Sequence, residues 1–329
     1  MYDRWVDSQS VEVSENTLAK YRSDYRRCIQ NTEFEDMDIH DINEEIIKKY
    51  LIQTTKRLGL NKRALTNLAG YIRCTFNSAR INRVIQYNPF DYIELKKIYK
   101  FCNETHKSNA ERIMSDQEMA KMLGAIKERK LEKDWYIPTY AVHMAILTGM
   151  RVGELSALAW TDIADDYIWL SKSEKRKRVV GNKPTIEIEK TKTGKDRMIP
   201  LTGEIRNLLR EIWQVQKKYG INAEYVFEGQ EGRIHATTIS DCARSLSNSA
   251  GIPCKSIHCM RRTLSSNLKR INVPTPAISS MLGQTDEVNI NHYTYDTSDM
   301  DYKTKMLDQV NKKVISLVDS GDILQVKEA

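Results

Sequence analysis

A polar stretch about one third of the way along the chain, "CNETHKSNAER" at residues 102–112, separates two strongly patterned regions. Just before it, "NPF" at residues 88–90 combines a turn-forming Asn-Pro pair with the end of a helical pattern. Just after it, Ser115 and Glu118 have the spacing of a capping box, which marks the first turn of a new helix. A chain of 329 residues is also long for one hydrophobic core. The sequence therefore predicts two domains joined by a linker at residues 102–112.

The region before the linker, residues 1–101, has the apolar periodicity of helices. Hydrophobic residues recur at spacings of three and four within residues 14–30, 43–58 and 61–81. The opposite face of the last segment is basic and carries Lys62, Arg63, Arg73 and Arg80. We therefore expect a small all-helical domain with one basic side.

The region after the linker, residues 113–329, mixes helices with short strands. An apolar segment that runs from Pro138 to Gly149 is typical of a buried helix. Strand patterns follow in "DYIWLS", "TIEIEK" and "RMIPL", and a turn at Thr193-Gly194 is expected to join the last two. From about residue 202 the helical pattern returns. The predicted fold class is mainly α with a small antiparallel β-sheet.

Composition narrows the classes of function. The formal net charge is +7, which favours a polyanionic partner. No apolar run reaches the roughly 18 residues that span a bilayer, and "MYDRWVDSQS" lacks the features of a secretory signal. We therefore expect a cytoplasmic protein with no membrane partner, and its 6 cysteines to be reduced thiols. Cys254, His258 and Cys259 lack a fourth ligand at a recognisable spacing, so no metal site is predicted.

Basic residues at structural corners are candidates for chemistry. Arg151 comes just after a glycine, and Glu154 lies three positions on, close enough to hold its guanidinium. Lys192 lies near the tip of the predicted strand pair. His258 and Arg261 are three apart, so on a helix they project side by side. Each alone is explained as a salt-bridged arginine, a solvated lysine or a partly buried histidine, and only their order along one chain makes the set informative.

This order resembles that of the tyrosine recombinases, the phage integrase family. "TGMRVGELSALAWTDI" is similar to the first arginine box of that family, with Arg151 and Glu154 at matching positions. "TKTGKDRMIPL" resembles its strand-turn-strand lysine box, in which Lys192 matches the catalytic lysine. "HCMRRTLSSNL" resembles its histidine-x-x-arginine box, with His258 and Arg261 at the two named positions.

The stretch "MLGQTDEVNINHY" resembles the closing box of the family. There, a residue after Leu-Gly precedes the nucleophilic tyrosine by nine positions, and Gln284 precedes Tyr293 by nine, whereas Tyr295 falls outside this spacing. Gln284 stands where histidine or tryptophan is usual, and Arg262 where a histidine often follows the second arginine. The resemblance covers about residues 14–310. Many integrases carry an amino-terminal arm-binding domain before this region, so we expect either a simpler recombinase or a sequence from which that domain has been removed.

The resemblance implies a domain organisation. Residues 1–101 would form a SAM-like core-binding domain that contacts DNA, for which Lys62, Arg63 and Arg73 are candidates. Residues 113–329 would form the mixed α/β catalytic domain, with a carboxyl-terminal tail at 297–329. Apolar residues along that tail either pack on their own domain or dock on a neighbouring subunit, namely Tyr302, Met306, Val310, Val314 and Leu317.

The resemblance also implies a reaction. Tyr293 would attack a phosphodiester to leave a 3′-phosphotyrosyl link and a free 5′-hydroxyl, while the two arginines stabilise the charge on the phosphate. Lys192 would protonate the leaving oxygen, His258 would hydrogen-bond the attacking side, and Gln284 would donate to a phosphate oxygen. Because the covalent link conserves the bond energy, no metal or nucleotide cofactor is required.

The implied role is integration and excision of a mobile element. The implied partners are double-stranded DNA recombination sites and a homotetramer on synapsed DNA, with an excision directionality factor as a further candidate. A type IB topoisomerase would use the same chemistry but relax a supercoiled plasmid that lacks any recombination site. A DNA-binding regulator that has lost catalysis is the other alternative, and the intact set of site residues argues against it.

The segment "SKSEKRKRVVGNKP" holds six basic residues against one acidic residue between the first two strand patterns. It is either a solvated loop or a phosphate-contacting segment beside the active site. The candidates for phosphate contact are Lys172, Lys175, Arg176 and Lys177.

Overall fold

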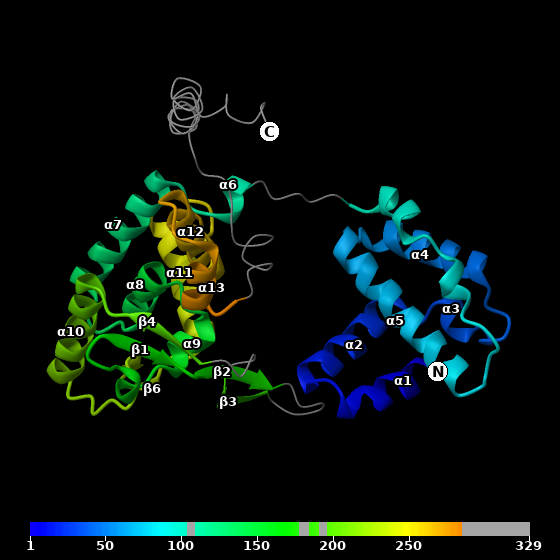
Figure 1. The fold of residues 1–329 in the computed structure, drawn as a ribbon, viewed down its shortest axis with the longest axis horizontal. Coiled ribbons are helices and arrows are strands. Elements are labelled where there is room, and N and C mark those ends of the chain that lie inside the picture. Colours follow the sequence, from blue (N-terminus) through cyan, green and yellow to red (C-terminus); the bar gives the residue numbers. More distant parts are fainter. Residues whose placement is uncertain (104–108, 178–183, 191–195, 285–329) are drawn as a thin grey trace, which may run out of the picture. The chain divides into compact units, whose positions relative to one another are not determined.

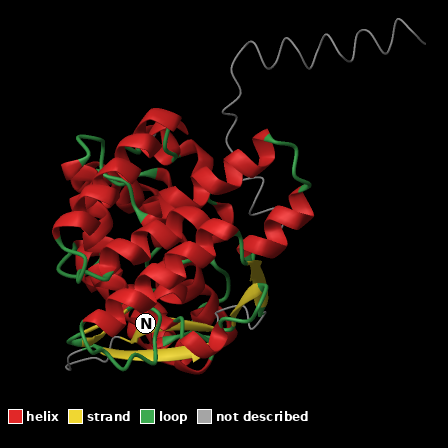
Figure 2. Ribbon diagram, turned by 90° about the vertical axis from the view of Figure 1, so that its left-hand side faces the viewer, coloured by secondary structure: helices red, strands yellow, loops and turns green. Residues whose placement is uncertain are grey.

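A computed structural model describes residues 1–329 except 104–108, 178–183, 191–195 and 285–329. The chain falls into two compact units, one made of Met1–Lys107 with Lys175–Glu187, the other of Ser108–Glu174 with Ile188–Ala329. Helices dominate the described chain and its strands are short and antiparallel, which confirms the predicted fold class (Figures 1 and 2). The predicted domain limits stay predictions, although the first division between the units falls inside the predicted linker.

The three longest helices of the first unit lie where the apolar periodicity predicts them, and shorter helices accompany them. Its helices are α1 (Tyr2–Ser8), α2 (Glu15–Cys28), α3 (Glu33–Asp36), α4 (Glu44–Leu58) and α5 (Lys62–Ile81), with 3-10 helices at Gln9–Val11, Pro89–Tyr92, Leu95–Lys97 and Tyr99–Phe101. Asn43 and Asn61 cap α4 and α5, because their side chains accept hydrogen bonds from backbone N–H groups of the first turn. Gly59 ends α4 with a left-handed φ of 58°.

Helix α1 was not among the predicted helices. Tyr2, Trp5 and Val6 are buried, and the Trp5 ring stacks on Tyr21 with centroids 5.1 Å apart. These three apolar residues follow the helical spacing, but a pattern of only seven residues is too short to stand out in the sequence. The helix therefore owes its place to aromatic packing within the unit rather than to a local signal.

The second unit is arranged around one apolar helix, α8 (Pro138–Thr148). Nearly all of its residues are buried, and it packs against the helices α7, α10, α11 and α12. The remaining helices are α6 (Asn109–Arg112), α7 (Asp116–Glu132), α9 (Val152–Ala157), α10 (Gly203–Lys218), α11 (Ala236–Ser249), α12 (Ile257–Arg270) and α13 (Thr275–Leu282). Ser115 and Glu118 form the expected capping box on α7. Although α8 is strongly apolar, neither it nor any other described helix is long and apolar enough to cross a membrane.

The strands correct two expectations. They are β1 (Tyr167–Leu170), β2 (Lys172–Lys177), β3 (Thr185–Lys190), β4 (Arg197–Pro200), β5 (Glu228–Gly229) and β6 (Gly232–Arg233). The basic stretch, for which a solvated loop was one of two interpretations, starts as strand β2, and this strand pairs with β3. Within the described residues β4 pairs with β1, so the expected β3–β4 pair is wrong. Matched burial explains the register, because Ile168 and Leu170 of β1 face Ile199 and Arg197 of β4.

Candidate active site

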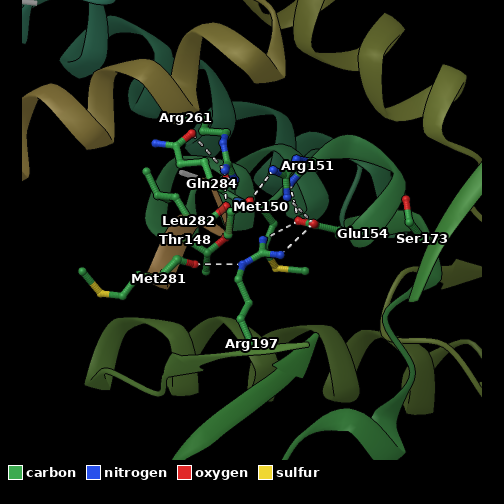
Figure 3. Close-up of polar contacts among 12 residues, drawn as sticks. Thr148, Met150, Arg151, Glu154, Ser173, Arg197, Arg261, Met281, Leu282 and Gln284 are labelled. Carbon is green, nitrogen blue, oxygen red and sulfur yellow. Dashed lines mark hydrogen bonds and ion pairs between the residues drawn. The ribbon is translucent and has the colours of Figure 1, made fainter. Parts of the chain in front are cut away.

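The first arginine box sits at a sharp change of direction between α8 and α9. Gly149 ends α8 with a φ of 63°, and Arg151 occupies the N-cap of α9. The Glu154 carboxylate accepts a hydrogen bond from the Arg151 backbone N–H at 2.8 Å and another from its Nη1 at 2.9 Å (Figure 3). The predicted contact between these two side chains is therefore present.

A third residue, Arg197 at the start of β4, completes this ion cluster (Figure 3). Its Nη1 and Nη2 donate to Oε1 and Oε2 of Glu154 at 2.8 and 2.6 Å. Burial by itself would raise the pKa of the Glu154 carboxyl, but the hydrogen bonds and charges of Arg197 and Arg151 hold it at about 2. Glu154 is therefore a buried carboxylate that stays ionised between two guanidiniums.

The second arginine, Arg261 on α12, is fully buried at 0% exposure. Its Nη1 donates to the Gly149 carbonyl at 2.8 Å, and its Nη2 to the Leu282 carbonyl. Arg151 also binds the end of α13, because its Nη2 donates to the Gly283 carbonyl at 2.7 Å. Arg261 thus binds the end of α8 beside the first arginine box, and both arginines bind the end of α13, where the closing box begins (Figure 3).

Two glycines make this close arrangement possible. Gly283 ends α13 with a φ of 61°, and a Cβ atom there would lie 2.8 Å from Cδ of Arg197. Gly149 is also left-handed, and a Cβ atom there would lie 2.9 Å from a methyl group of Leu282. Any side chain would therefore meet both backbone strain and a steric clash at either position.

His258 lies on the first turn of α12, on the same helix as Arg261. Burial of the ring and the charges of Arg262, Arg261 and Arg151 lower the pKa of His258 to about 4. The imidazole is therefore neutral at physiological pH in the free protein.

The structure brings together most of the predicted site residues that it describes. Arg151, Glu154, Arg261 and Gln284 lie in one cluster, in which Gln284 Oε1 is 3.5 Å from Arg261 Nη2. Lys192, Tyr293, Tyr295 and the tail lie outside the described residues. Arg197 was missed, although it belongs to the quoted "TKTGKDRMIPL" stretch. Its position in β4 could have indicated that Arg197 is buried, because buried and exposed residues alternate along this strand and Arg197 takes a buried position.

The residues predicted to contact DNA are on the surface or partly exposed. Lys62 and Arg63 are exposed at the start of α5, and Arg176 is exposed on β2. The others include Arg73, paired with Asp91 at 3.2 Å, Lys172 with Asp162 at 3.2 Å, Lys177 with Glu187 at 2.7 Å, and the half-buried Lys175. Their contact with phosphates stays a prediction.

The single acid of the basic segment, Glu174, has a structural role that the sequence did not indicate. Its carboxylate accepts hydrogen bonds from Arg233 and Ser156 at 2.6 and 2.7 Å and lies 2.9 Å from His235 Nδ1. Gly153 packs directly against this part of β2, since a Cβ atom there would lie 2.5 Å from Oγ of Ser173. The start of β2, at Ser173 and Glu174, is therefore held against α9 within the second unit.

Comparison with known protein families agrees with the geometry of this site. Residues 94–299, more than half of the chain, match the phage integrase family. The chain belongs to this family. It is a tyrosine recombinase that cleaves and rejoins DNA at specific sites.

Relatives and solved structures agree with the family assignment. A "Tyrosine recombinase XerC-like" of Caldanaerobacter subterraneus subsp. tengcongensis is 28% identical over 300 residues, which is 85% of this chain and 74% of that protein. An integrase of Staphylococcus phage L54a is 29% identical over 185 residues, covering 53% of this chain and 51% of the phage protein. The Tn1549 transposon integrase in complex with a circular intermediate DNA has the same fold, with a TM-score of 0.75 at 19% identity, covering 94% of this chain and 98% of that chain.

The unusual protonation of His258 can be measured directly. In an NMR titration of the free protein, the His258 imidazole should stay neutral until the pH falls to about 4, because burial and the neighbouring guanidiniums oppose its protonation. The folded protein then binds fewer protons than the unfolded chain between about pH 6.5 and 4, so this group destabilises the fold as the pH falls through that window. The exposed His40 is the internal control, since its hydrogen bond to Asp38 raises its pKa. A His258 resonance, identified by its loss in His258→Asn, that titrated at or above pH 6.5 would contradict this electrostatic account.

Proposed function

We propose that this recombinase integrates and excises a mobile element, and that Tyr293 is its nucleophile. The observation that carries the proposal is the pair of arginines held by backbone carbonyls of other boxes, Arg261 by Gly149 in the first arginine box and Arg151 by Gly283 in the closing box. The phage and transposon integrases among its relatives support the mobile-element role. The partner would be double-stranded DNA at recombination sites in the cytoplasm.

Electrostatic stabilisation is the proposed task of the arginines. A phosphodiester under attack gains negative charge on its non-bridging oxygens, and a rigid guanidinium can donate two hydrogen bonds to them. The Arg151 side chain keeps 37% exposure, so it can meet a phosphate directly. Arg261 is fully buried, so direct contact requires its surroundings to rearrange on DNA. A preorganised donor of this kind contributes ~3 kcal/mol to transition-state stabilisation.

Proton transfer would be shared between two residues. A neutral imidazole has one acceptor nitrogen, so His258 would accept a hydrogen bond from the attacking tyrosine. Lys192 would act on the opposite side and protonate the departing 5′-oxygen. Gln284 would donate from its amide to a phosphate oxygen, while its carbonyl faces Arg261.

The nucleophile assignment has a direct test. Tyr293→Phe keeps the ring and removes only the oxygen, so DNA affinity should survive while covalent protein–DNA adducts on a nicked suicide substrate vanish. Tyr295→Phe is the matched control and should still form adducts. Mapping the phosphotyrosyl peptide to Tyr295, or finding adducts with Tyr293→Phe, would overturn the assignment. Recombination between two plasmid-borne element ends, absent from a plasmid that lacks them, would separate this activity from that of a topoisomerase.

The general-acid role of Lys192 can be separated from simple phosphate binding. Lys192→Ala should slow cleavage of an ordinary phosphodiester by about 10²–10⁴-fold, which is the usual contribution of a general acid. A substrate with sulfur at the 5′-bridging position should restore the rate, because a thiolate leaves without a proton. Equal defects on the oxygen and sulfur substrates would leave Lys192 with phosphate binding alone.

Assembly on DNA forms the last part of the proposal. A lambda integrase of the same fold has been solved as a tetramer bound to a Holliday junction, and we propose that four copies of this chain synapse two DNA sites, with an excision directionality factor as a further partner. Truncation after Asp299 should spare binding to one DNA site and abolish the synaptic tetramer, because the apolar stripe of the tail would dock on a neighbour. Native gel shifts and light scattering distinguish the two states. A truncated protein that still formed tetramers on DNA would refute the role of the tail.

A further inference from the structure

Arg197 is the least accessible member of the Glu154 cluster after Glu154 itself. Its side chain is 7% exposed, and each of the three guanidinium nitrogens donates a hydrogen bond. Two donors go to Glu154, and Nε donates to the Met281 carbonyl at 2.9 Å. One side chain therefore joins β4, α9 and the end of α13.

The two arginines share Glu154 unequally. Arg197 binds both carboxylate oxygens through its side chain, at 2.8 and 2.6 Å. Arg151 reaches only one oxygen through its side chain, at 2.9 Å, and its other nitrogen donates to the neutral carbonyl of Gly283. A forked contact to both oxygens is the strongest form of this pair. The negative charge of Glu154 is therefore balanced mainly by Arg197.

We propose that Arg197 is a positioning residue for strand cleavage, which takes up the charge of Glu154 and so keeps the charge of Arg151 available to the scissile phosphate. Without Arg197, the buried Glu154 carboxylate would have Arg151 as its remaining partner and would draw that guanidinium into a forked, neutral pair. The effect acts through Arg151 and requires no contact between Arg197 and DNA. This inference rests on the proposed function, because it assumes that Arg151 meets the phosphate.

The charge on the scissile phosphate provides a readout that a purely structural role would not move. A methylphosphonate replaces one charged non-bridging oxygen with a neutral methyl group, so its cleavage depends less on the charge of Arg151. Arg197→Met should slow adduct formation on the ordinary phosphate by about 10²-fold at saturating protein, the loss typical of one donor to the transition state. The defect on the methylphosphonate should be at least about tenfold smaller.

A matched control comes from the same unit. Arg233 also pairs with a buried acid, at 2.6 Å from Glu174, and its side chain is 15% exposed. Arg233→Met removes a comparable ion pair and should lower stability, but the ratio of the rates on the two substrates should stay that of the unaltered protein. Thermal unfolding of both variants shows whether they are folded at the assay temperature.

A second comparison keeps the test decisive if R197M does not fold. In the Glu154→Gln background the charge that Arg197 balances is gone, so adding R197M should change the cleavage rate little. Arg197→Lys keeps the charge, so its ratio of rates on the two substrates should stay close to that of the unaltered protein. Adding R197M to E154Q and finding a loss as large as about 10²-fold would overturn the inference, as would equal R197M defects on both substrates. If the unaltered protein formed no adducts, the proposed function itself would fail.

Discussion

The carboxylate of Glu154 is the buried charge on which the arrangement of the site depends. With 1% exposure it cannot be solvated, and an unpaired charge in such a place would cost several kcal/mol. Two guanidiniums therefore have to lie beside it, one from its own helix start and one from β4. Both arginines also bind carbonyls at the end of α13, so a single carboxylate determines where that helix end lies.

The carbonyl groups at helix ends are the second feature that positions the arginines. The last carbonyls of an α-helix have no partner within the helix, and they carry partial negative charge. Arg261 binds the carbonyls of Gly149 and Leu282 at the ends of α8 and α13, and Arg151 binds that of Gly283. The same guanidiniums that we assign to the phosphate thus already satisfy the ends of two helices. The Arg151 side chain, which keeps exposed surface, is thus held before any DNA arrives, and this is the property that electrostatic catalysis requires.

Local sequence signals predicted the helices and most of the described site. Ser115 at the start of α7 and the glycine at the end of α8 are signals that depend only on neighbouring residues, and the structure has both. Strand pairing was different, because the partner of β4 depends on matched burial across about thirty residues rather than on the turn beside it. Arg197 was missed because a charged residue in a short strand usually indicates the solvent side, whereas here it indicates a buried acid in another element. Glu174 was hidden for the same reason, since its partners Arg233 and His235 come about sixty residues later.

The glutamine at position 284 stands where the family usually has histidine or tryptophan, and its surroundings give this departure a physical meaning. An amide differs from those rings because it carries a strong acceptor and two donors on one flat group. In the described chain the Gln284 oxygen faces Arg261 Nη2 at 3.5 Å, while its buried Nε2 has no hydrogen-bond partner among the described residues. A buried donor without an acceptor costs about 1–3 kcal/mol, so an arriving phosphate oxygen would be favoured there. Glutamine can therefore hold the buried arginine with its oxygen and still offer the donor that the proposed role requires.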